Sequence, residues 1–545
     1  MSKNSLKIAI LCILTPFFIM PSCALLDVDS EDLVTRNEFY TTLGDAWAIK
    51  IGLYGSMQNL MEQYFVLGEL RGDLVTPARG AKNNPDMLEF MEHNISPDNK
   101  YLDWSGFYHL INQCNDALVS LPVIKANVAD FEDHWYNHII GEVLWIRAWA
   151  YLTLVKNWGD VPFITEPVYS VQDVVAIQPT CADCILDQLE ADLAWAVRHL
   201  IMNWAWARLP TYWNHETVNM AAGVNLLGDV LLHRDKYEQA WSRSALRKVI
   251  DPAVFDVQPN GSREFWNNSF NLGRASGEYA PNGESWFAAN FRWAMEGFQG
   301  TWTLQGLVLA FDTESSYDGG RYNLNHTLGK ITSNRPEWGE QYIVKPSVPA
   351  VENWLLPARD QNRGERYSYF VDRSVEPYDT LIWKYIGIDH NGNRRGNNRE
   401  TGSGNINIHR VADLYFRGAE AAARLGIVSE AIEILRQSTA AVVTFPPFIN
   451  VNSSIEAVED AIMKERAQEL AFEMYRWYDL VRIAKRRDDP NYLIDKVVAA
   501  RPAEIRDEIR ARLEFQSENL WKLPYGSRAV RLNPALLEPC IPLSK

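Results

Sequence analysis

The sequence predicts an all-α protein in which a helical frame carries a large irregular segment. Apolar residues recur at the spacing of an α-helix toward both ends of the 545-residue chain. Between about residues 251 and 407, Gly, Asn, Pro and Ser alternate with aromatic residues, and long helical patterns stop. We therefore expect a helical-repeat frame at about 38–250 and 408–487, an irregular insert at about 251–407, and a C-terminal segment at 488–545.

Nine helices are expected in the frame, each within a few residues, at about 38–66, 104–122, 134–158, 181–202, 216–233, 236–250, 410–425, 428–442 and 455–487. The helix at 134–158 carries apolar residues on more than one side, which predicts an internal position. It should end where Gly159 adopts a left-handed cap and Pro162 prevents the helix from resuming. The aromatic residues that we expect in the core are Trp145, Trp149 and Trp158.

Two helix pairs have the spacing of a tetratricopeptide repeat, in which small residues let antiparallel helices approach closely. The matching residues of the first pair are Leu227, Gly228, Leu231, Ala240 and Pro252. Those of the second pair are Ala419, Ala431 and Leu435. In the first pair, Ser244 replaces the expected aromatic residue. Two such pairs with short turns indicate a helical-repeat frame.

The first residues have the pattern of an export signal. Lys3 and Lys7 precede an apolar run at 8–20 that is too short to span a bilayer, and Cys23 follows a small residue. We interpret residues 1–22 as a lipoprotein signal peptide and Cys23 as the lipidated residue. The alternative is an ordinary cleavage in which Cys23 has no special role.

Composition and motifs exclude several classes of function. The net charge of −16 repels phosphate backbones, so we expect no nucleic-acid partner. The pair Cys181 and Cys184 has no second metal-ligating pair nearby, which favours small buried side chains or a local disulfide over zinc. A calcium-like loop at 389–400 has Arg394 where the turn needs Gly, so it is interpreted as a flexible polar loop. We expect no metal and no cofactor.

The charged residues at 465–486 are interpreted as structural rather than catalytic. On one continuous helix, Glu465, Glu469 and Glu473 would form a row of like charges, partly compensated by arginines at i+3 spacing. A glycosidase instead needs two carboxylates on opposite sides of a sugar, usually from separate elements. The sequence also has no nucleophile elbow, Walker loop or HExxH motif, so we expect no enzyme.

Two segments closely resemble signatures of the SusD/RagB family of outer-membrane nutrient-binding lipoproteins: GEVLWIRAWAYLTLVKNWGDVPFI (141–164) and ERAQELAFEMYRWYDLVRIAKR (465–486). Further matches follow in the family's order at 107–118, 221–250, 408–426 and 523–539. The resemblance covers essentially the whole chain after the signal. The closing loop and the Leu435–Ser438 segment depart from the family pattern, which indicates a divergent member.

The resemblance implies an all-α SusD-like fold on the cell surface of a Gram-negative bacterium, anchored to the outer membrane by its N-terminal lipid. It also implies capture of oligosaccharides without cleavage, and delivery to a SusC-like TonB-dependent transporter. Peptide uptake by a RagB-like relative is the main alternative. A secreted glycosidase and a pure scaffold are the others.

Sugar binding needs exposed aromatic rings for the apolar face of a pyranose and polar side chains for its hydroxyls. The irregular insert supplies the candidate rings Tyr279, Trp286, Trp293, Trp302, Tyr317 and Trp338. The loop after the first long helix, which the family often uses, supplies Asp73, Arg79 and Asn83. We expect at least two of these residues to contact ligand.

Overall fold

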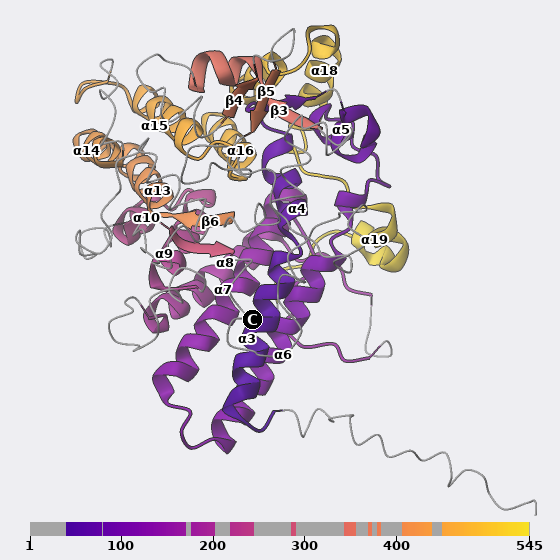
Figure 1. The fold of residues 1–545 in the computed structure, drawn as a ribbon, viewed down its shortest axis with the longest axis vertical. Helices are drawn as coiled ribbons and strands as arrows, with labels where there is room; N and C mark the ends of the chain where they lie inside the picture. The colour runs from indigo at the N-terminus through magenta and orange to yellow at the C-terminus, as the bar shows by residue number, and fades with distance from the viewer. Residues whose placement is uncertain are drawn as a thin grey trace, which may run out of the picture.

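The computed structural model describes residues 40–78, 80–170, 176–201, 218–244, 285–289, 343–355, 369–372, 379–382, 406–438 and 449–543. Helices dominate these residues, which confirms the predicted all-α class (Figure 1). The N-terminal half contains α3 (Leu43–Gln58), α4 (Met61–Phe65), α5 (Pro85–Met91), α6 (Ser105–Asn127), α7 (Asp133–Trp158), α8 (Ala182–His199), α9 (Met220–His233) and α10 (Tyr237–Ser244). The C-terminal half contains α13 (Val411–Arg424), α14 (Val428–Ser438), α15 (Ile455–Glu469), α16 (Arg476–Arg487), α17 (Asn491–Ala499), α18 (Arg506–Ser517) and α19 (Ser527–Leu532).

Helix α7 is the centre of the N-terminal half and packs against α3, α6 and α8 (Figure 1). Trp145, Trp149 and Trp158 are at most 3% exposed, which confirms that they belong to the core. Trp145 also donates its indole N–H to the Ala222 carbonyl at 3.0 Å, so its one polar atom is satisfied within the core. The helix ends at Gly159, whose φ of 80° lies in the left-handed region as predicted.

The two predicted helix pairs exist and pack together. Both α9 and α10 contact α13, which in turn packs against α14. Ala240, Ala419 and Ala431 are buried between these helices, as the repeat spacing requires. The turn of the second pair contains Gly426 at a φ of 76°. These contacts are consistent with tetratricopeptide-type packing.

Two of the predicted helices are interrupted, so the prediction that each is continuous was wrong. The helix expected at 38–66 divides into α3, α4 and a π-helix, η3 (Val66–Leu70). The helix expected at 455–487 divides into α15 and α16, because Phe472 and Met474 have φ values of 65° and 70°. The interruption packs on η3, where a Cβ on Gly68 would come within 2.2 Å of the Met474 carbonyl oxygen. Gly68 therefore permits a backbone contact that the 465–486 sequence does not reveal.

The described strands form three two-stranded antiparallel sheets: β1 (Val75–Pro77) with β3 (Val344–Pro346), β2 (Ser285–Ala289) with β6 (Ile406–Arg410), and β4 (Tyr369–Asp372) with β5 (Asp379–Ile382). The β2–β6 pair contacts α9, so the frame holds one strand from within the irregular insert and one from its C-terminal end. None of the helices within the described ranges is both long enough and apolar enough to cross a membrane.

Candidate functional site

The loop after the first helices and the irregular insert meet at the β1–β3 sheet. Its register pairs Val75 with Pro346 and Pro77 with Val344. One residue further, the Ala78 N–H donates to the Ile343 carbonyl at 2.8 Å. The sheet therefore brings together two regions that the sequence proposed independently for ligand contact.

Asp73 anchors this loop to α16. Its carboxylate is 3% exposed and accepts two hydrogen bonds from the Arg476 guanidinium, at 2.6 and 2.8 Å. Burial opposes ionisation of Asp73, but the Arg476 charge and hydrogen bonds outweigh it and lower its pKa. Both carboxylate oxygens are thus engaged within the protein. Sequence reasoning missed this pair because its members are 403 residues apart.

The other predicted ligand residues are placed only in part. Asn83 is exposed at the end of the short helix η4 (Ala81–Asn83). The backbone of Trp286 lies on β2, but its side chain is outside the described part of the chain. The remaining candidates fall outside the described residues altogether, as does the proposed lipidation site: Arg79, Tyr279, Trp293, Trp302, Tyr317, Trp338 and Cys23. Their roles stay predictions.

The charged residues of α13, α15 and α16 form a buried ion-pair network. Arg466, 1% exposed, joins Asp413 at 2.7 Å to Asp479 at 2.9 Å. Arg482 continues the chain from Asp479 to Glu420, both at 2.8 Å. This confirms the structural interpretation of the region. The expected row of Glu465, Glu469 and Glu473 on one helix face was wrong, because the chain leaves α15 before residue 473.

The network reaches α7 and α9 through Asp229, which pairs with Lys156 at 2.6 Å and with Arg417 at 2.9 Å. Burial raises the pKa of Asp229, Asp413 and Glu420, but the neighbouring cations lower each of them below its ordinary value. These carboxylates are therefore ionised at neutral pH and cannot act as proton donors there. A general acid needs the opposite arrangement, a carboxyl whose pKa is raised.

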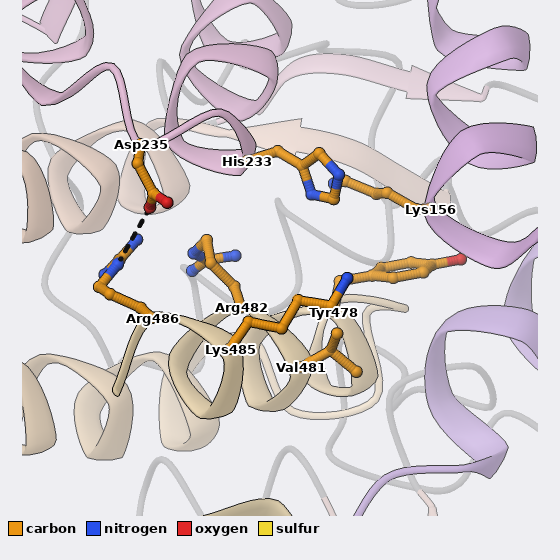
Figure 2. A pocket seen from close by; sticks show the side chains of 8 residues that line it. All are labelled: Lys156, His233, Asp235, Tyr478, Val481, Arg482, Lys485 and Arg486. Carbon is orange, nitrogen blue, oxygen red and sulfur yellow. Dashed lines mark ion pairs between the residues drawn. The ribbon is translucent and has the colours of Figure 1, made fainter. Parts of the chain in front are cut away.

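A pocket of about 90 Å³ opens beside this network, between the end of α9, α7 and one face of α16 (Figure 2). Its lining residues are Lys156, His233, Asp235, Tyr478, Val481, Arg482, Lys485 and Arg486. Burial and the neighbouring charges of Lys156 and Lys485 lower the pKa of His233 to about 3, so its ring is neutral at pH 7. The sequence offered no signal for this pocket, because its residues come from three helices.

Cys114, Cys181, Cys184 and Cys540 carry free thiols in the structure. Burial raises the pKa of Cys114 to about 12, which makes it an unreactive core residue. Cys181 and Cys184 are half-buried at the start of α8. Within the residues described, no group of His, Cys, Asp and Glu side chains has a geometry suited to a metal ion.

Comparisons with known proteins agree with this fold. The family model described as "SusD family" matches residues 359–538, and the model described as "Starch-binding associating with outer membrane" matches residues 51–214. A SusD-like protein of Formosa agariphila is 26% identical to this chain, and the alignment covers 87% of this chain and 90% of that protein.

Solved structures extend the agreement to three dimensions. A SusD-superfamily protein from Bacteroides vulgatus has a TM-score of 0.69 at 17% identity, over 91% of this chain and 98% of that one. A protein described as a laminarin-binding SusD-like protein has a TM-score of 0.62 at 18% identity, with the same coverage of 91% and 98%. The molecule is thus a helical protein with the SusD-superfamily fold. Its sequence belongs to the SusD/RagB family.

Proposed function

We propose that this protein is a cell-surface glycan-binding lipoprotein that captures oligosaccharides and delivers them to a SusC-like TonB-dependent transporter of the outer membrane. The observation that carries the proposal is the family membership, which includes a match to a model described as starch-binding and outer-membrane-associated. The similarity to a laminarin-binding structure supports a glycan as the ligand class. Removal of residues 1–22 and acylation of Cys23 would supply the membrane anchor.

In this proposal, the ligand lies where the loop that follows β1 meets the irregular insert. Arg79 follows Ala78, whose N–H is bonded to the Ile343 carbonyl. Trp338 precedes Ile343 by five residues in the sequence. A ring from the insert and polar groups from the loop, such as Arg79 and Asn83, would together supply the two kinds of contact that a pyranose needs. The buried pair of Asp73 and Arg476 would hold the loop in place.

The proposed activity is binding without cleavage. In the described part of the chain, Asp229, Asp413 and Glu420 of the buried network are bound to arginine or lysine and have lowered pKa values. Burial raises the pKa of Glu142, but this carboxyl is bound to Lys50 and Tyr54 inside the frame. A glycosidase needs one carboxyl with a raised pKa beside the scissile bond. Release of reducing sugar from oligosaccharides by the purified protein would support the glycosidase alternative instead.

The glycan-binding proposal is tested on a glycan array with the chain from residue 24 onward, followed by affinity measurement on the best ligand. Trp338→Ala should weaken binding by roughly 1–3 kcal/mol, the usual cost of removing a central ring. That cost corresponds to about tenfold in affinity for every 1.4 kcal/mol. Phe515→Ala is the matched control, because Phe515 is 71% exposed on α18 and lies outside the proposed site.

Equal affinities of the two variants and the unaltered protein would show that Trp338 does not contact the glycan. Binding of peptides but of no glycan would select the RagB-like alternative. Delivery to a transporter needs a separate test, which is purification of the tagged protein from solubilised outer membranes. Co-purification of a TonB-dependent barrel is expected, and its absence under mild detergent would contradict that part of the proposal.

A further inference from the structure

The wall of the pocket between α7, α9 and α16 is strongly cationic although the whole chain has a net charge of −16. Four of its lining side chains are basic: Lys156, Arg482, Lys485 and Arg486. Asp235 supplies the only carboxylate among the lining residues, and its side chain is 60% exposed to water. Water screens such an exposed charge more than it screens the buried side chains of Lys156, Arg482 and Arg486.

Two of these cations already form ion pairs with buried carboxylates. Lys156 is bound to Asp229 at 2.6 Å, and Arg482 is bound to Glu420 and Asp479 at 2.8 Å. They contribute positive charge to the wall, but each is already bound to a carboxylate. The remaining groups decide what the pocket can bind.

Lys485, Arg486 and His233 keep unused hydrogen-bonding capacity on the pocket wall. Among the described residues, Lys485 forms neither a hydrogen bond nor an ion pair, and Figure 2 shows its side chain extended toward Tyr478. The Arg486 side chain is 2% exposed; its Nη1 binds Glu420 and Glu459, and its Nε lies 3.5 Å from Asp235 (Figure 2). Its Nη2 has no hydrogen-bond partner among the described residues. His233 faces both across the pocket, and no hydrogen bond of its ring is found in the described structure.

A buried guanidinium nitrogen without a partner is costly, because the group has lost water and gained nothing in exchange. A bound anion would remove this cost and also give Lys485 a counter-charge. The pocket volume of about 90 Å³ admits several waters or one group of the size of sulfate or phosphate, since a water occupies about 30 Å³ in the liquid. Both the donors and the space therefore fit a compact oxyanion.

We propose that this pocket binds one oxyanion of the size of sulfate or phosphate, held by Lys485, Arg486 and His233 against the α16 face. The site belongs to the helical frame and is independent of glycan capture by the insert. The anion is either a free inorganic ion or an anionic group on a small sugar, and these two sources share the same chemistry. Binding would tie the end of α9 to α16 across the pocket.

The test is calorimetric titration of the full-length purified protein with sodium sulfate, at an ionic strength held constant with sodium chloride. Saturable binding with one site per chain is expected. Lys485→Gln should weaken it about ten- to hundredfold, the usual worth of a charged hydrogen bond. This variant should fold normally, because Lys485 forms no ion pair in the described structure. Lys82→Gln is the control, since Lys82 is exposed on η4 and does not line the pocket.

Absence of saturable sulfate binding to the unaltered protein would overturn the proposal, and so would equal affinities for Lys485→Gln and Lys82→Gln. A second titration distinguishes the sources of the anion. Displacement of sulfate by glucose 6-sulfate, but not by glucose, would support the site and assign it to an anionic sugar. Binding of sulfate without such displacement would support a site for the free ion. Loss of glycan binding in the insert variants would leave each of these outcomes unchanged.

Discussion

The two halves of the helical frame are stabilised by different forces. Around α7, buried contacts are mainly apolar, with Trp145, Trp149 and Leu189 almost fully excluded from water. Around α16, Arg466 and Asp413 are excluded to the same degree, yet they are charged and paired. Apolar contacts gain free energy in proportion to the area that they bury, whereas a buried ion pair is favourable only while each charge keeps its partner. The first half should therefore tolerate small changes gradually, and the second should fail when one member of a pair is lost.

The largest effect is expected from Arg466→Met in the charged half. The substitution leaves Asp413 and Asp479 buried with one cation fewer, although each retains another arginine. Breaking a buried pair in this way usually costs about 3–5 kcal/mol, and we expect a loss of that size in the free energy of unfolding in urea.

The matched control for Arg466→Met is Arg510→Met, which removes an exposed pair with Asp495. Exposed pairs contribute about 1 kcal/mol or less, so this variant should unfold almost like the unaltered protein. Similar losses in both variants would show that the burial of the network has no energetic consequence. The proposed difference between the two halves would then be lost.

A smaller loss is expected from Leu189→Ala in the apolar half. Leu189 is fully buried on α8, and its truncation removes apolar contact and leaves a cavity. We expect the free energy of unfolding to fall by about 3 kcal/mol, equally at low and high salt. Leu189→Met keeps the volume and should cost less than about 1.5 kcal/mol. A loss that varies strongly with salt would show that this half also depends on electrostatics.

The same difference explains how much of the fold the sequence could predict. The helix expected at 134–158 is found at Asp133–Trp158, because apolar periodicity and the Gly159 cap are local signals. The helix expected at 455–487 is interrupted after Glu469, although residues 465–486 contain neither Gly nor Pro. The reason lies elsewhere in the chain, in the backbone contact between Gly68 and Met474. Periodicity cannot reveal a contact between distant segments.

Prediction of the candidate site from the sequence meets the same limit. Arg476 binds Asp73, which the sequence had suggested for ligand contact. No local spacing links two residues 403 positions apart. The sequence did select the two regions that the β1–β3 sheet brings together, because aromatic and polar residues gather in irregular segments. It could not tell which of these side chains remain available to a ligand.

The last expected effect, which needs no substitution to appear, is a dependence of stability on pH that centres on His233, at the border between the two halves. Burial, followed by the charges of Lys156 and Lys485, lowers the pKa of His233 from about 6.5 to about 3. Between these values the unfolded chain binds a proton that the folded chain does not. The free energy of unfolding should therefore fall as pH falls from 6.5 toward 3, by up to about 1.4 kcal/mol per pH unit from this residue.

The measurement is urea unfolding between pH 7 and pH 4 in buffers without sulfate or phosphate. His233→Gln should reduce the slope of unfolding free energy against pH by the contribution of one proton. The rest of the slope should remain, because three other histidines also have lowered pKa values: His93, His138 and His409. An unchanged slope would show that His233 reaches water in the folded state. In that case water would enter the pocket beside the charged half, and the ion-pair network there would be more exposed to solvent than the burial of Arg466 indicates.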